Sequence, residues 1–199
     1  MIGSSGDAVG GSVGSWSVRA IVGTMIPVLA VLSVLEMGSG FVLHELEQTF
    51  LDRPTLLVLV PVMIAMGGNL GSILSARLST RLHLGTLSFS PRDPVIMTNV
   101  VAVLALAVTV FTALGFFAYG LTLVPVVGVG GGMTLRETVL VSVVSGMMLA
   151  VVAVVLSISA TYASYRLGLD PDDTTIPVVT NLCDILGVVI LAVVSLLVL

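Results

Sequence analysis

Long apolar stretches constrain this chain more than any other feature. A helix of about 20 apolar residues crosses the ~30 Å hydrocarbon core of a bilayer, and stretches of that length recur along the sequence. Runs this long without alternating polarity do not suit a membrane barrel, because a barrel strand is short and alternates. We therefore predict an all-α membrane protein, embedded in a lipid bilayer, with five transmembrane helices at about residues 17–46, 55–78, 94–123, 135–165 and 174–199.

Composition supports the same reading. Apolar residues make up 57% of the chain and charged residues 9%, whereas soluble domains carry roughly 25% charge. Residues 1–16 are rich in Gly and Ser and predict a disordered N-terminal tail, while residues 17–199 form one transmembrane domain. The net charge of −4 argues against a nucleic-acid partner.

Arginine placement predicts the orientation of the helices. All basic residues are arginines, and in a five-span order most of them fall on one side of the membrane. By the positive-inside rule this side is cytoplasmic, which places the N-terminus inside and the C-terminus outside a multi-pass protein of the cell membrane. The inner group is Arg19, Arg77, Arg81, Arg92 and Arg166, and the outer group is Arg53 and Arg136. The acidic loop 45–52 would then face outward, either as an ordinary solvated loop or as a concentrator of cations.

The last apolar stretch contains an aspartate, Asp184, near its middle. A carboxylate at this depth costs about 3 kcal/mol on insertion scales, so it is normally retained for an ion pathway or a partner group. Ten residues of helix place it ~15 Å deep, close to the bilayer midplane. Thr180 lies one turn earlier on the same face. Both are candidate metal-binding residues; the alternative is a protonated Asp184 bonded to a neighbouring helix.

A second polar interruption, Asn69, lies in the glycine-rich run 67–71. Glycines there permit close backbone approach or local unwinding, and helical rise puts Asn69 ~12 Å from the inner face. We therefore expect Asn69 and Asp184 to share one layer of a pore. The alternative is a small-residue packing seam built on Gly67 and Gly71.

No nucleophile with a histidine base, phosphate-binding loop or paired histidine ligands occurs, so we predict that the protein is not an enzyme. One buried carboxylate is a poor site for Mg²⁺, which prefers six oxygens and sheds its water reluctantly. A symmetric homodimer would bring two copies of Asp184 to one axis and balance the charge of a hydrated ion. Asn69 and Thr180 would then contact the ion's waters.

Two segments carry a family resemblance: VPVMIAMGGNLGSILSARLST around Asn69, and LGLDPDDTTIPVVTNLCDILGVVI around Asp184. They resemble the transmembrane domain of the MgtE magnesium channels and the related eukaryotic magnesium solute carriers. The resemblance implies a homodimer of five-helix protomers whose pore, at the interface, is lined by the second and fifth helices. It implies that Asp184 holds hydrated Mg²⁺, with Asn69 and Thr180 beside it. Further candidate pore-lining residues are Gly68, Asn181 and Glu36.

These observations predict a divalent-cation channel or transporter with Mg²⁺ as the transported ion. They leave open a proton- or Na⁺-coupled exporter that uses the same aspartate, and a non-transporting membrane assembly subunit. Selectivity for Mg²⁺ over Mn²⁺, Co²⁺ or Ca²⁺ does not follow from the residues. The chain departs from the bacterial channels in lacking the cytoplasmic N-terminal and CBS domains that gate their pore, so the sequence leaves open how this pore is gated.

Overall fold

The structure is a computed structural model that describes residues 18–90, 93–124 and 132–199, so the expected tail 1–16 lies outside the described residues. Regular structure in the described part of the chain is helical throughout. The helices are α1 (Val18–Glu45), α2 (Glu47–Asp52), α3 (Pro54–His83), α4 (Pro94–Thr122), α5 (Leu135–Leu167) and α6 (Pro171–Val198). Five of them are long and apolar enough to span a membrane, which confirms the predicted spans; only α2 is too short.

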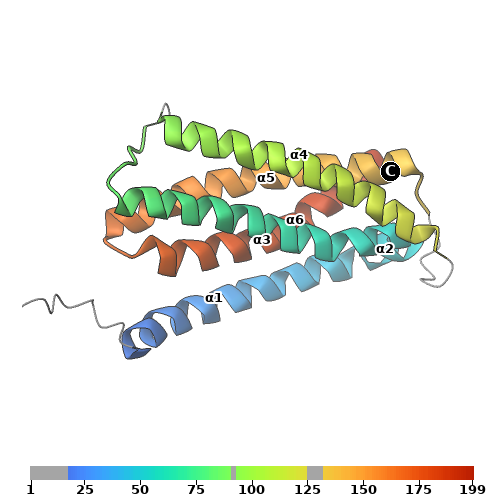
Figure 1. The fold of residues 1–199 in the computed structure, drawn as a ribbon. Helices are drawn as coiled ribbons and strands as arrows, with labels where there is room; N and C mark the ends of the chain where they lie inside the picture. Colours follow the sequence, from blue (N-terminus) through green and yellow to red (C-terminus); the bar gives the residue numbers. More distant parts are fainter. Residues whose placement is uncertain (1–17, 91–92, 125–131) are drawn as a thin grey trace, which may run out of the picture.

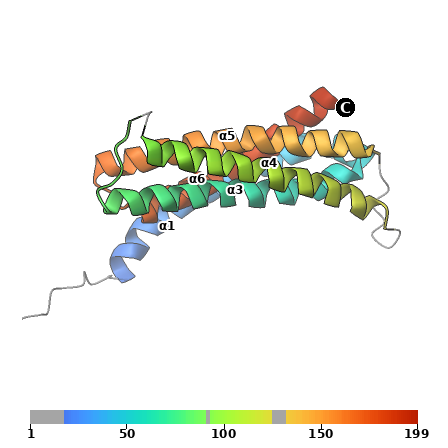
Figure 2. The same ribbon diagram turned by 45° about the horizontal axis from the view of Figure 1, so that its top comes forward.

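Helices α3, α5 and α6 pack against one another and form the centre of the bundle. Helix α4 covers α3 and α5, and α1 lies along the opposite edge of the molecule (Figures 1 and 2). Among the described helices, α1 contacts only α6 and α2. In the apolar stretch of α1, 6% of the residues are buried inside the bundle, whereas the share is 44% in α3 and in α5. Most of α1 is therefore left to contact lipid or another chain.

Small residues let the helices approach closely, as is usual in membrane bundles. Between α4 and α5, the Phe111 ring lies directly over Gly146, where any side chain would collide with it. The Ser142 hydroxyl donates a hydrogen bond of 2.7 Å to the Phe111 carbonyl in the same seam. The seam therefore combines close packing with a buried polar contact.

The ends of the helices are defined by local chemistry. Asp93 caps α4 and accepts a hydrogen bond from the Val95 amide, and Pro94 follows at a position that has no use for an N–H. Thr134 and Glu137 form a capping box at the start of α5. Gly168 ends α5 with φ of 68°, a left-handed conformation that favours glycine.

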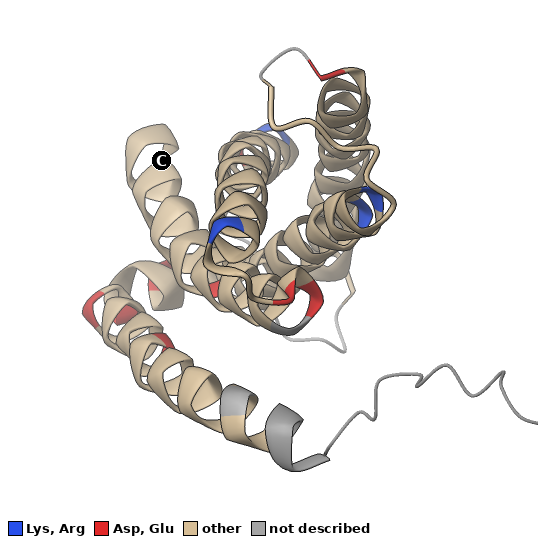
Figure 3. Ribbon diagram, turned by 90° about the vertical axis from the view of Figure 1, so that its left-hand side faces the viewer, with Lys and Arg blue, Asp and Glu red and all other residues tan. Residues whose placement is uncertain are grey.

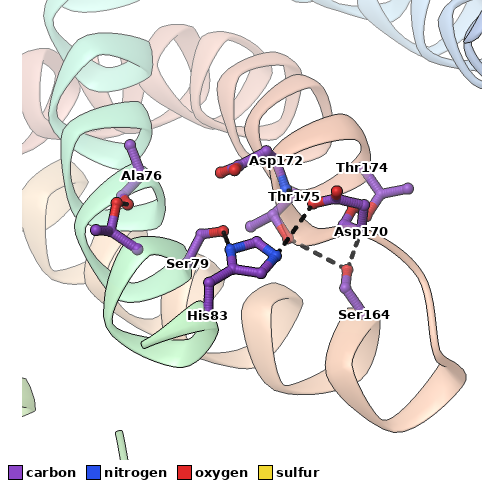
Figure 4. Close-up of polar contacts among 9 residues, drawn as sticks. Ala76, Ser79, His83, Ser164, Asp170, Asp172, Thr174 and Thr175 are labelled. Atoms are coloured by element: carbon purple, nitrogen blue, oxygen red, sulfur yellow. Dashed lines mark hydrogen bonds and ion pairs between the residues drawn. The ribbon is translucent and has the colours of Figure 1, made fainter. Parts of the chain in front are cut away.

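Polar side chains join α3, α5 and α6 at the end where α6 begins (Figure 4). The Ser164 hydroxyl lies 2.9 Å from that of Thr174 and 3.2 Å from that of Thr175. His83 approaches Asp170 with 3.9 Å between Nε2 and Oδ1. These contacts fix the start of α6 against both of its central neighbours.

The arginines of α3 and α5 lie at the two ends of the bundle that their order in the sequence predicts. Of the described arginines, Arg77, Arg81 and Arg166 lie near the end at which α3 and α5 finish, and Figure 3 looks onto this end. Arg53 and Arg136 lie where α3 and α5 begin.

The structure differs from the sequence prediction at residues 45–52. This stretch, expected as a loop, contains the helix α2, because Phe50 anchors it with an exposure of only 2%.

Helix α3 continues through residues 67–71 without unwinding. Of the two possibilities that the glycines offered, the structure shows close backbone approach. A packing seam of this kind can also flank a pore.

Candidate functional site

Helices α3 and α6 meet along a stripe of glycines on α3. A Cβ atom at Gly67 would lie 2.5 Å from Leu149 Cδ2 of α5, and one at Gly71 would collide with Val179 of α6. Cys183 is buried beside this contact, in the packing role expected of an isolated apolar cysteine. The stripe therefore brings the backbone of α3 directly against the α6 side chains.

Gly68 is the residue of this stripe that faces Thr180 and Asp184. A Cβ atom there would lie 2.9 Å from Thr180 Cγ2 and 3.1 Å from Asp184 Oδ1. Both distances are shorter than ordinary van der Waals contact, so only glycine fits without a shift of its neighbours. The structure thus brings together three of the residues singled out by sequence: Gly68, Thr180 and Asp184.

Ser72 completes this group, and sequence reasoning missed it. Its Oγ lies 2.9 Å from Thr180 Oγ1 and donates a hydrogen bond of 2.7 Å to the Gly68 carbonyl. Because the single Ser72 proton is used in the second bond, Thr180 donates in the first. The Thr180 oxygen keeps its lone pairs available for another donor. The signal in the sequence was the spacing, since Ser72 lies one turn after Gly68 on the same face.

Asp184 is half-buried and has no hydrogen-bond or ion-pair partner among the residues that the structure describes. Within the described part of this one chain, no neighbouring helix supplies a bond to this carboxyl group. Glu36, an exposed residue of α1, is close enough for its charge to interact with that of Asp184. Two carboxyl groups of one protomer thus lie near each other inside the spans, and neither has a basic partner in the described structure.

The two asparagines differ in their availability. Asn69 is exposed on α3 and forms no hydrogen bond within the described structure, so its amide is free to meet groups outside the protomer. Asn181 instead turns back on its own helix and donates a hydrogen bond of 2.9 Å to the Pro177 carbonyl. One of its two N–H donors is therefore occupied, and the amide oxygen remains to face a ligand.

The available donors are oxygens: the Asp184 carboxylate, the Thr180 hydroxyl and the Asn69 amide. Hard cations such as Mg²⁺ and Ca²⁺ prefer such ligands. No group of three or more His, Cys, Asp or Glu side chains that could hold a metal occurs in the described ranges. One protomer therefore offers too few ligands for a bare dication, and the donor set suits an ion that keeps most of its water.

Comparison with known protein families gives a match to this chain. The family model described as "MgtE: Divalent cation transporter" matches residues 60–194. The matched region begins within α3 and ends within α6, so it contains every residue of the group around Asp184 except Glu36.

Proposed function

The chain belongs to the MgtE family of divalent cation transporters, and from this premise we propose that it is a Mg²⁺ channel of the cell membrane. It is a multi-pass membrane protein, and its family transports ions and is not a family of enzymes. The observation that carries the proposal is Asp184: a carboxyl group within a span that lacks a cationic partner in the described structure and lies beside the Thr180 hydroxyl. Such a group is costly in a membrane and is normally retained for an ion pathway.

Two copies of the chain would complete the site. In a symmetric homodimer, paired Asp184 carboxylates would balance the +2 charge of one Mg²⁺ on the dyad. The ion would keep its first water shell, because Mg²⁺ dehydrates reluctantly, and Asn69 and Thr180 would accept or donate hydrogen bonds to those waters. The free amide of Asn69 and the free lone pairs of Thr180 support this arrangement.

The unit we propose covers residues 17–199, because α1 packs on α6 and brings Glu36 near Asp184. Glu36 would add negative charge at the approach to the site. A negative cell interior would drive Mg²⁺ inward through such a channel. Two charges moving through 100 mV gain about 4.6 kcal/mol, so uptake needs no coupled reaction.

The test is Mg²⁺ flux into liposomes that contain the purified protein and a Mg²⁺-sensitive dye. We expect Asp184→Asn, nearly isosteric but uncharged, to abolish flux while the protein remains folded, since it removes both charges of the dimer. Asp52→Asn, the same change at an exposed residue at the end of α2, is the control and should leave flux unchanged.

Wild-type flux from Asp184→Asn would contradict the assignment. A simultaneous record of internal pH separates a channel from a proton-coupled exporter, because only the exporter moves protons in proportion to Mg²⁺. If the wild-type protein conducts no ion, the alternative of an assembly subunit is favoured.

A further inference from the structure

A groove whose lining shares no residue with the group around Asp184 opens between α4, α5 and the segment that connects α3 to α4. Its volume is about 540 Å³, within the roughly 300–1,000 Å³ range of ligand-binding pockets. Its wall is apolar along the α4 and α5 spans, and Ser159 lies at its exposed side. The residues that give it this character are Phe89, Ile96, Met97, Val100, Ile158 and Tyr162.

Its position near the end of α5 predicts that the groove lies where the hydrocarbon gives way to lipid headgroups. Tyr162 is five residues before the end of α5, or ~7.5 Å of helical rise. Phe89 packs edge-on against Tyr162 at 5.1 Å between ring centroids, and Tyr165 lies 5.7 Å from Phe89. Aromatic clusters of this kind are typical of the membrane interface. The apolar part of the groove therefore extends from this interface toward the hydrocarbon.

A positive charge lies beside one of the residues that line the groove. The Arg166 guanidinium carbon is 5.8 Å from the centroid of the Tyr162 ring, and Tyr162 itself lines the groove. Arg166 is exposed and forms no ion pair within the described ranges. Asp93, the acidic residue of the connecting segment, accepts hydrogen bonds from Ser88 and Val95.

We propose that this groove binds an anionic phospholipid, with one acyl chain along α4 and α5 and the phosphate on Arg166. The charge of Arg166 complements a phosphate, and a guanidinium can bind two of its oxygens at once. The apolar wall beneath it complements the acyl chain of the same molecule. The groove thus selects lipids by the charge of the headgroup, and this binding is independent of the ion pathway at Asp184.

The experiment is native mass spectrometry of the purified full chain, titrated with phosphatidylglycerol or with phosphatidylcholine of identical acyl chains. We expect the wild-type protein to bind phosphatidylglycerol about fivefold more tightly, as one arginine near a membrane surface predicts. Arg166→Gln should remove this preference. Arg81→Gln is the matched control, because Arg81 is an exposed arginine at the same end of the bundle, but only Arg166, of the arginines whose side chains the structure describes, lies over the ring of the groove residue Tyr162. It should retain the preference.

A second variant tests the groove itself. Ser159→Phe places a ring in the groove and should weaken binding of both lipids, with helicity by circular dichroism as the check on folding. If that protein does not fold, Met97→Trp, at a residue 53% exposed on the other wall, takes its place. Equal binding of the two lipids by the wild type would overturn the proposal, as would an unchanged preference in Arg166→Gln. A groove-filling variant that alters the oligomeric state but not lipid binding would show that a second copy of the chain covers this surface, and would also overturn it.

Discussion

At the residue scale, the absence of a Cβ atom at Gly68 determines how closely α3 and α6 approach at the site. Its position in the middle of α3 is one where alanine would be the better helix former by about 1 kcal/mol. The glycine instead lets Thr180 and Asp184 sit against the α3 backbone. The backbone carbonyl of Gly68 also orients Ser72, which in turn fixes the Thr180 hydroxyl. One hydrogen atom in place of a methyl group thus controls the position of both oxygen donors of α6.

We therefore predict that Gly68→Ala destabilises the protein by roughly 1–3 kcal/mol, because the new methyl group overpacks the contact with Thr180 and Asp184. It should also lower Mg²⁺ flux. Unfolding in detergent, compared with Gly120→Ala, measures the first effect. Gly120 is half-buried in α4, and a Cβ atom there meets nothing within 4 Å, so its substitution should be neutral or slightly stabilising. Equal effects of the two changes would show that Gly68 is not held by packing.

A second prediction at this scale concerns Thr180. Thr180→Val keeps the shape of the side chain but removes its hydroxyl group. The lost hydrogen bond to Ser72 should cost only about 0.6 kcal/mol of stability. If the oxygen also accepts a hydrogen bond from a water of the hydrated ion, flux should fall about tenfold, the equivalent of 1.4 kcal/mol. Thr180→Ser should restore most of the flux. Liposome flux and thermal melting of the two variants separate the roles, and equal flux from valine and serine would remove Thr180 from the ion pathway.

At the scale of the helix, Asp93 organises the start of α4. Its carboxylate accepts hydrogen bonds from the Ser88 amide and hydroxyl, both at 2.7 Å, and from the Val95 amide at 2.8 Å. These bonds favour the charged form, and those from Ser88 contribute most to holding the pKa of Asp93 below its ordinary value of 3.8. The same bonds tie the connecting segment to the first turn of α4.

The lowered pKa predicts a pH-dependent contribution to stability. In acid the unfolded chain binds a proton at Asp93 before the folded protein does, so stability rises with pH in that window and is complete above about 3.8. It is lost as the pH falls through the folded pKa. Asp93→Asn should therefore melt at a lower temperature than wild type at pH 6. The difference between the two melting temperatures should become smaller toward pH 3. A difference that does not depend on pH would contradict the role of the charge.

Hydropathy predicted the helices well, because apolar length is nearly sufficient to define a membrane span. It could not predict α2, since six residues anchored by one buried phenylalanine leave little periodic signal. Motif reasoning singled out Asp184 because a carboxylate in a span is costly, and Thr180 because it lies one turn earlier on the same face. It missed Ser72, because a serine in a membrane helix can donate a hydrogen bond to its own backbone. Its hydroxyl group is then not an unpaired polar group, so its presence in a span needs no functional explanation. The proximity of Glu36 to Asp184 depends on how α1 packs against α6, which no local pattern encodes.

At the scale of the whole molecule, the helices differ in how much of their surface is buried by neighbouring helices. Helices α3 and α5 are well buried, while α1 touches only α6 and α2 among the described helices. Asn69 is exposed one residue after the Gly68 that contacts Asp184. An exposed amide without a hydrogen bond is unfavourable in hydrocarbon, since lipid offers it no partner. This position is more consistent with a wet cavity, such as the pore that we propose between two copies.

The final prediction tests that cavity. In a background in which Cys183 is replaced by serine, Asn69→Cys should react with a small charged thiol reagent from the aqueous phase, because a water-filled pore reaches it. Mg²⁺ should slow the reaction by occupying the site beside Asp184, and adding Asp184→Asn should abolish this protection while leaving the thiol reactive. Val101→Cys is the control, at a residue 58% exposed on the span of α4, which lipid would cover. It should react slowly, with or without Mg²⁺. If the cysteine at position 69 behaves like that at position 101, Asn69 faces lipid, and a pore between two copies of α3 and α6 cannot be correct.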